Sequence, residues 1–274
     1  MKKILAVSGG IDSVVMLHQM RNDPDVVVAH FDHGIRECSV DDCDFVEKLA
    51  KQYQKSFFYE HAHLGNKCSE ERARTERYAF LQRIAREQHG QIYTAHHLDD
   101  VIESIAINFL RGTGWRGLTP FFQSDIQRPL LTVAKSDIYR YATANHLSFR
   151  QDSTNTEDYY LRNRIRRWLN QNFSDVQKRE LFILFQQQTE IRKNIESLLN
   201  ELIQDSKRLS RALLIDQQSG IEILRAFLSR NQISLTRPQL ERCYESATTL
   251  SANKKISLDR VHFLVIGRFY LTIS

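Results

Sequence analysis

Short apolar segments that alternate with helical segments constrain the fold of this chain more than any other feature. Continuous apolar runs begin at Ile4, Val26 and Ile92, and residues 56–60 form a further β-like run. Between these runs, residues 13–20, 41–55 and 69–89 have the spacing or composition of helices. Short apolar runs are typical of buried strands, and strands that alternate with helices form parallel sheets. The sequence therefore predicts an α/β fold with a doubly wound, Rossmann-like parallel sheet.

Polar clusters follow three of the predicted strands, at residues 8–13, 32–34 and 96–100. In doubly wound sheets, ligands bind outside the carboxyl ends of the strands. We therefore expect the functional site to be built from these three clusters.

The pattern changes after Asp175, where apolar residues recur every three or four positions, as in a long amphipathic helix. Two further helices are expected at 219–231 and 237–248, and β-like runs follow at 256–258 and 263–273. We therefore expect a catalytic domain over residues 1–172, a linker helix over 173–205 and a small C-terminal α+β domain over 206–274.

The positive charge lies in the second half of the chain. Residues 1–150 carry 19 basic and 19 acidic side chains, whereas residues 151–274 carry 19 and 14, which accounts for the whole net charge of +5. Such a bias indicates a polyanionic partner. A solvated basic surface without a partner is the alternative.

Cysteine usage and hydropathy indicate a cytoplasmic protein without a membrane partner. No segment approaches the about 18 apolar residues of a membrane span, and the first apolar run is too short for a signal peptide. The four cysteines, Cys38, Cys43, Cys68 and Cys243, show no CxxC spacing. No Cys or further His lies at zinc-ligand spacing from His33, His96 and His97. Reduced thiols are therefore expected, and a zinc site is not.

The segment Ser8-Gly-Gly-Ile-Asp-Ser13 joins a predicted strand to a predicted helix. Glycines allow close approach of the backbone, and N–H groups at a helix start favour an anion. The lysine of a Walker A loop is missing, and the Gly-Gly pair alone would also suit a tight turn. The whole segment resembles the SGGxDS signature of the PP-loop ATP pyrophosphatases, which transfer AMP from ATP to a carbonyl oxygen. This resemblance implies that ATP, with Mg²⁺, is bound by Ser8, Gly9, Gly10, Ile11, Asp12 and Ser13.

Further motifs narrow the resemblance. They are found, in this order, at residues 29–36, 71–78, 94–103, 111–118, 128–131, 152–155 and 162–166. Together they are similar to the tRNA(Ile)-lysidine synthase family, in its short form. The family adenylates the wobble cytidine of tRNA-Ile with a CAU anticodon, and free L-lysine then displaces AMP to give lysidine. The resemblance implies that tRNA-Ile and L-lysine are the substrates, and it leaves open whether the chain forms a homodimer.

Acidic residues supply the charges that this chemistry needs. Asp99 and Glu103 are spaced four residues apart at a predicted helix start, with Asp100 between them. Such a cluster could simply be a solvated helix start, where carboxylates favour the helix dipole. Carboxylates can also hold Mg²⁺, bind an ammonium group or accept its proton. The resemblance gives these catalytic roles to Asp32, Asp99, Asp100 and Glu103, with Asp99 and Asp100 as candidate Mg²⁺ ligands.

Basic and glycine-rich segments complete the predicted site. By resemblance, Arg74 and Arg164 are candidates to neutralise charge at the α-phosphate. Alternatively, such arginines are surface charges, and the arginines beside Trp168 also suit contacts with RNA phosphates. The segment 111–118 is either a helix cap and turn or a segment that closes over the base and ATP. The expected substrate-binding residues, besides Asp32, are His33, His96, His97, Arg111, Gly112, Gly114, Arg162, Asn163 and Arg166.

Two other functions remain open from the sequence. A tRNA thiolase of the same superfamily would use paired or persulfide-carrying cysteines, for which Cys38 and Cys43 are the candidates. A non-catalytic tRNA-binding protein would have lost loop or carboxylate positions, and none of them is missing here. An amidotransferase would need a further domain or ammonia channel, for which 274 residues leave little room.

Overall fold

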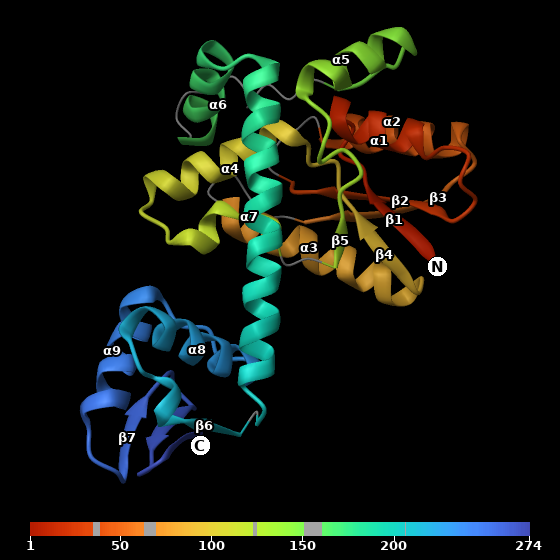
Figure 1. The fold of residues 1–274 in the computed structure, drawn as a ribbon. Coiled ribbons are helices and arrows are strands. Elements are labelled where there is room, and N and C mark those ends of the chain that lie inside the picture. Colours follow the sequence, from red (N-terminus) through yellow and green to blue (C-terminus); the bar gives the residue numbers. More distant parts are fainter. Residues whose placement is uncertain (35–38, 63–69, 123–124, 151–160, 206) are drawn as a thin grey trace. The chain divides into compact units, whose positions relative to one another are not determined.

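A five-stranded parallel sheet organises the first part of the chain (Figure 1). The computed structural model describes residues 1–34, 39–62, 70–122, 125–150, 161–205 and 207–274. The strand order is β3-β2-β1-β4-β5, and each neighbouring pair is parallel. The strands are β1 (Lys2–Ala6), β2 (Val26–Asp32), β3 (Ser56–His61), β4 (Gly90–Tyr93) and β5 (Ile126–Gln127). The predicted doubly wound α/β fold is confirmed.

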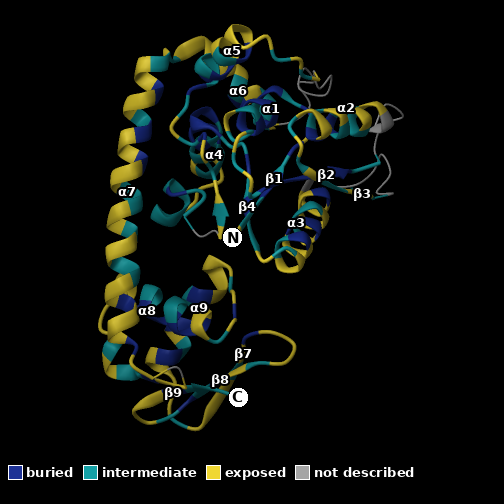
Figure 2. Cartoon of the chain, turned by 90° about the vertical axis from the view of Figure 1, so that its right-hand side faces the viewer, coloured by how far each residue is buried: buried dark blue, intermediate teal, exposed yellow. Residues whose placement is uncertain are grey.

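Alternation along the strands supplies both faces of this sheet with apolar side chains. Leu5 and Val28 pack on one side, where the covering helices are α1 (Ile11–Gln19), α2 (Ser39–Gln52) and α5 (Lys135–Ala144). Ile4 and Val27 pack on the other side, against α3 (Glu70–Glu87). Figure 2 shows the strands between α1 and α2 on one face and α3 on the other. All seven residues of β2 are buried, as expected for a strand covered on both faces.

A third apolar cluster lies among helices and holds the candidate site. It joins α4 (Leu98–Leu110), α6 (Leu161–Asn172) and the first half of α7 (Asp175–Leu202). Its buried members include Val101, Ile165 and Phe182, one from each helix. The sequence analysis did not anticipate α5, α6 or the two-residue strand β5.

The chain divides into two compact units, Met1–Thr189 and Glu190–Ser274, and the division falls inside α7. The second unit contains β6 (Arg208–Ser210), α8 (Gln217–Arg230), α9 (Arg237–Thr249), β7 (Lys254–Ser257), β8 (Phe263–Ile266) and β9 (Tyr270–Ile273). Its sheet is antiparallel in the order β6-β9-β8-β7, and Phe227 and Leu264 belong to its core.

One detail of this unit differs from the expectation. The single β-like run expected over 263–273 is a hairpin of β8 and β9. Gly267 begins the turn, with its N–H donating to the carbonyl of Tyr270 at 2.8 Å. A Cβ at Gly267 would come within 2.8 Å of the same oxygen, so the turn needs glycine. Separately, no helix in the described ranges combines the length and apolar character needed to span a bilayer.

Candidate active site

The topology of the sheet places the candidate site. From β1 the chain adds β2 and β3 on one side, and then β4 and β5 on the other. Such a switch opens a crevice outside the carboxyl ends of the strands, between β1 and β4. The loop 8–13 follows β1 and the cluster 96–100 follows β4, so two of the predicted clusters flank this crevice. The third cluster, 32–34, follows the neighbouring strand β2.

The loop 8–13 is shaped by glycine and by two serines. Gly9 has φ +87, a left-handed conformation that side chains disfavour. The Ser13 hydroxyl donates to the carbonyl of Gly10 at 2.8 Å and accepts the N–H of Ser8 at 3.2 Å. The N-cap of α1 is Gly10, which has no side chain to cap the N–H groups that follow it. A helix start of this kind suits a phosphate group, and the observed geometry of the loop therefore fits an anion.

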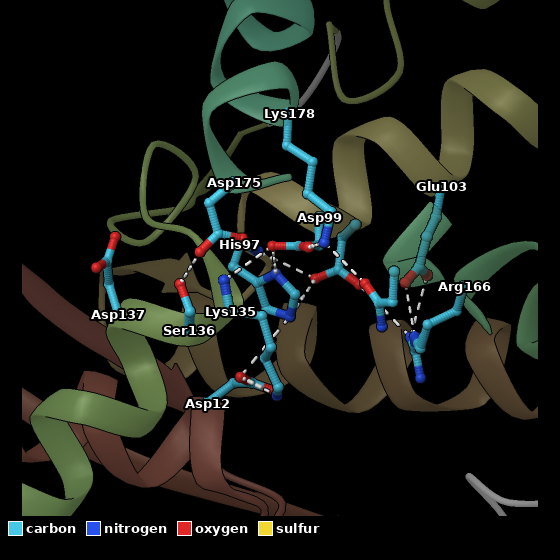
Figure 3. Close-up of polar contacts among 12 residues, drawn as sticks. Asp12, His97, Asp99, Glu103, Lys135, Ser136, Asp137, Arg166, Asp175 and Lys178 are labelled. Atoms are coloured by element: carbon cyan, nitrogen blue, oxygen red, sulfur yellow. Dashed lines mark hydrogen bonds and ion pairs between the residues drawn. The ribbon is translucent and has the colours of Figure 1, made fainter. Parts of the chain in front are cut away.

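His97 stands among three carboxylates at the start of α4. Its Nε2 lies 3.7 Å from Asp12 and 3.6 Å from Asp100, and its Nδ1 lies 3.7 Å from Asp99. Asp12 also forms an ion pair with Lys135 at 2.5 Å. Figure 3 shows the His97 ring between Asp12 and Asp99. The ring thus links the loop after β1 to the cluster after β4.

Asp99 is neutralised by a lysine that the sequence analysis did not single out. Lys178, on α7, is 5% exposed, and its Nζ lies 2.6 Å from Asp99 Oδ1 and 2.7 Å from Asn170 Oδ1. The other oxygen of Asp99 accepts the backbone N–H of Lys135 at 2.8 Å, at the start of α5. Figure 3 shows Lys178 reaching Asp99 from α7. Both oxygens of Asp99 are therefore engaged by the chain itself.

Glu103 and Asp100 pair with arginines of α6. Glu103 is 1% exposed and accepts Arg166 Nε at 2.6 Å and Arg162 Nε at 3.1 Å. Arg162 also donates to Asp100 at 3.3 Å. Burial alone would raise the pKa of Asp100, but His97 and Arg162 hold the pKa below its ordinary value. The side chains of the three acidic residues of α4 are thus fixed by ion-pair partners from α6 and α7.

Asp32 is held separately, at the end of β2. Its buried carboxylate accepts the backbone N–H of Gly34 at 2.8 Å, the ring of His61 at 2.6 Å and the hydroxyl of Tyr59 at 3.3 Å. Burial and the neighbouring Asp32 and Cys43 raise the pKa of Tyr59 to about 12, so the phenol stays protonated as a donor. Neither His61 nor Tyr59 was among the predicted site residues.

His96 is a neutral ring in a positively charged corner. Burial lowers the pKa of His96 to about 3, opposed by Asp100 and reinforced by Arg128, Arg77 and Arg74. Its Nδ1 pairs with the Thr94 hydroxyl at 2.8 Å. Arg74 itself is exposed on α3 and stacks over the ring of Tyr78 at 5.0 Å. The predicted residues Arg74 and His96 are therefore electrostatically linked, because the positive charge of Arg74 helps to lower the pKa of His96.

The buried histidines should make the free energy of unfolding depend on pH. Burial also lowers the pKa values of His30 and His33. The unfolded chain takes up protons on these rings below about pH 6.5, whereas the folded protein takes them up only at lower pH. The stability present at pH 7 should therefore decrease as the pH falls to 5. Urea denaturation at the two pH values measures the loss.

The variant His96→Asn should make this loss smaller, because one of the titrating rings is gone. His89→Asn is the matched control, since His89 is exposed and has a φ of 48 that Asn adopts readily. If His96→Asn and His89→Asn changed the pH dependence equally, His96 would not be a neutral ring in the fold.

Other predicted residues lie away from the carboxylates. Arg111, Gly112 and Gly114 follow the far end of α4, about 18 Å from its start at 1.5 Å per residue. Gly112 has φ +69, and its N–H donates to the carbonyl of Phe109, which caps the helix. The cap-and-turn interpretation thus describes the conformation of this segment. Arg164 is exposed on α6, Asn163 is half-buried beside it, and the motif 152–155 lies outside the described residues.

The described residues contain neither a cluster that could hold a metal ion nor a thiol activated by its surroundings. Within the described ranges, no three His, Cys, Asp or Glu side chains are grouped to hold a metal ion. Burial raises the pKa values of the thiols of Cys43 and Cys243, which disfavours the reactive thiolate. Cys38 and Cys68 lie outside the described residues.

Comparisons with known proteins agree with this geometry. A family model described as a PP-loop domain matches residues 1–173. The tRNA(Ile)-lysidine synthase of Persephonella marina is 35% identical over 178 residues, which cover 60% of this chain and 39% of that protein. The tRNA(Ile)-lysidine synthase of Geobacter sulfurreducens is 31% identical over 287 residues, covering 98% and 59%. This chain therefore spans only about two to three fifths of the length of these relatives.

A solved structure shows the same fold at lower identity. The U34-tRNA thiolase NcsA from Methanococcus maripaludis superposes with a TM-score of 0.57 and 18% identity, covering 69% of this chain and 72% of that one. This likeness concerns the arrangement of the sheet and its helices.

Proposed function

The chain belongs to the PP-loop family of ATP-binding domains, and on this premise we propose that it is a tRNA(Ile)-lysidine synthase. The proposed reaction joins free L-lysine to the wobble cytidine of tRNA-Ile with a CAU anticodon and converts ATP to AMP and pyrophosphate. The observation that carries the proposal is the similarity to the Geobacter sulfurreducens enzyme across 98% of this chain.

The loop 8–13 is proposed to bind the phosphates of ATP. Its glycines let the backbone approach closely, and the N–H groups at the start of α1 point at the anion. ATP supplies an adenylate group that turns the base carbonyl oxygen into a leaving group, and Mg²⁺ would enter with the phosphates. Arg74, in the positive corner around His96, would stabilise charge at the α-phosphate.

Carboxylates of the site are proposed to bind the ammonium group of the lysine substrate and to accept its proton. Only the neutral amine attacks the activated carbon, so a group must bind the ammonium and accept its proton. We assign this part to Asp32 and Asp100. Asp99, whose charge is paired with the buried ammonium group of Lys178, is assigned a supporting role in place of the catalytic one expected from the sequence. Glu103 would orient Arg162 and Arg166.

The second unit is proposed to contact the body of the tRNA. Residues 190–274 carry 13 Lys and Arg against nine Asp and Glu. Phe263 and Tyr270 are exposed on its sheet, and the guanidinium of Arg268 stacks over Phe269 at 5.2 Å. Aromatic and basic side chains together suit an RNA surface.

The proposal is tested by incubating the protein with CAU-anticodon tRNA-Ile, ATP, Mg²⁺ and radiolabelled lysine. Label is expected in the tRNA only when ATP is present, with one AMP released for each lysine incorporated. Elongator tRNA-Met, which shares the anticodon, is the comparison substrate. Absence of lysine-dependent label would refute the proposal, and label transferred from a sulfur donor would favour a thiolase.

A further inference from the structure

The helix α6 divides its arginines between two faces. Arg162 and Arg166, one turn apart, point to Glu103 on α4, and Ile165 and Leu169 on the same side are buried. Residues three and four positions apart lie on one face of a helix. The remaining arginines, Arg164 and Arg167, therefore face outward together with Trp168 and Gln171.

These outward residues line an open pocket. Its volume is about 470 Å³, and its lining consists of Arg164, Arg167, Trp168 and Gln171. The α6 segment contains four arginines and no acidic residue. Two of these arginines, Arg164 and Arg167, belong to the pocket lining, whereas Arg162 and Arg166 pair with Glu103 and Asp100.

Trp168 presents a large aromatic surface in this pocket. It is 54% exposed, and the ring of Phe173 braces its edge at a centroid distance of 5.6 Å. Its backbone is fixed, because the adjacent Leu169 is buried in the cluster with α4 and α7. An exposed, braced tryptophan beside two arginines provides a stacking surface for a base and cations for the neighbouring phosphates.

We propose that this pocket binds an unpaired nucleotide of the RNA substrate, whose base stacks on Trp168 while Arg164 and Arg167 contact the flanking phosphates. The inference rests on the proposed function only in taking the substrate to be an RNA with unpaired bases. The inner face of α6 holds the carboxylates of the candidate active site, and the outer face would hold the stacked nucleotide. The helix α6 thus connects the proposed nucleotide pocket to the arginines that pair with Glu103.

The fluorescence of Trp168 provides a direct test. The chain has two tryptophans, so Trp115→Phe leaves Trp168 as the single emitter. We expect titration with an RNA hairpin, whose loop carries the CAU anticodon, to quench this emission. A fully paired RNA duplex of the same stem should leave the emission nearly unchanged, because its bases are not available for stacking.

Affinity provides an independent measurement. Trp168→Ala in the full chain should weaken hairpin binding about 5- to 150-fold, the effect of losing one stacked base, whereas Trp168→Phe should retain most of the affinity. The matched control is Val176→Ala, because Val176 is an exposed apolar residue of the same unit outside the pocket. Thermal unfolding of each variant separates loss of contact from loss of fold.

The outcomes separate this inference from the proposed function. If wild-type protein incorporates lysine but Trp168→Ala binds the hairpin normally and Trp168 emission is unchanged, the pocket assignment is wrong and the function stands. Quenching by AMP alone, as strong as by the hairpin, would also overturn it, because the pocket would then take a free nucleotide. If the hairpin quenches Trp168 but no lysine is incorporated, the RNA site stands and the proposed reaction fails.

Discussion

Replacing Lys178 by Met is expected to lower the free energy of unfolding by about 3–5 kcal/mol, the usual effect of removing one partner of a buried ion pair. The methionine fills a similar volume, so the loss comes from the charge. Asp99 would remain buried without the ammonium group that now lies 2.6 Å away, and Asn170 would lose its donor. Urea denaturation followed by circular dichroism measures the change.

Two further variants test whether the unpaired buried charge of Asp99 causes the loss of stability in Lys178→Met. Lys193→Met removes an exposed lysine of the same helix, which pairs with the exposed Glu190, and should change stability by less than about 1 kcal/mol. In the double variant Lys178→Met with Asp99→Asn, no unpaired buried charge remains, so part of the lost stability should return. A loss of less than 1 kcal/mol for Lys178→Met alone would mean that Asp99 is hydrated or protonated in the folded protein.

Replacing Asp32 by Asn is expected to reduce lysine incorporation by about 10²- to 10⁴-fold, the range for losing a proton-transfer group. The substitution keeps the shape of the side chain but puts an amide NH₂ where one carboxylate oxygen accepts hydrogen bonds. Only one of its two terminal atoms can then accept hydrogen bonds, so the bonds with Gly34, Tyr59 and His61 cannot all be kept as they are. Single-turnover incorporation of labelled lysine measures the rate.

The affinity for tRNA should stay within about twofold of wild type for Asp32→Asn, because this buried carboxylate is not part of the basic surface. Glu47→Gln is the control, since Glu47 is a partly exposed acidic residue that pairs with Lys51 on α2. A parallel loss of tRNA binding, or of the folded state in urea, would assign Asp32 a structural role. An unchanged rate would remove it from the proton-transfer step.

The sheet could be predicted from the sequence because its signal is local. Each strand from β1 to β4 is a short apolar or alternating run, and the helices between them have the spacing or composition expected for an α/β fold. β5 has only two residues, and α5 and α6 are polar outside a few buried positions such as Ile138 and Ile165. Their formation depends on packing against partners distant in sequence, which local periodicity does not reveal.

The site was predicted only in part, for the same reason. Glycines, serines and carboxylates at strand ends are visible in the sequence, because strand ends share one edge of the sheet. Lys178 lies 79 residues after Asp99, in an amphipathic helix where a lysine is ordinarily a surface residue. The four arginines of α6 were grouped as one basic segment. Helical periodicity alone could have separated Arg162 and Arg166 from Arg164 and Arg167, once the bounds of α6 were known.

The ion pair between α7 and α4 also has a consequence for the order of folding. The partners of Asp32 at Tyr59 and His61 belong to the adjacent strand, whereas Asp99 must wait for a helix that follows 79 residues later in the chain. Contacts this distant in sequence form late. A partly folded intermediate with a complete sheet but a detached α7 would keep Asp99 hydrated, because a bare carboxylate resists burial. The packing of α7 against α4 and the loss of water around Asp99 should therefore occur in the same kinetic step.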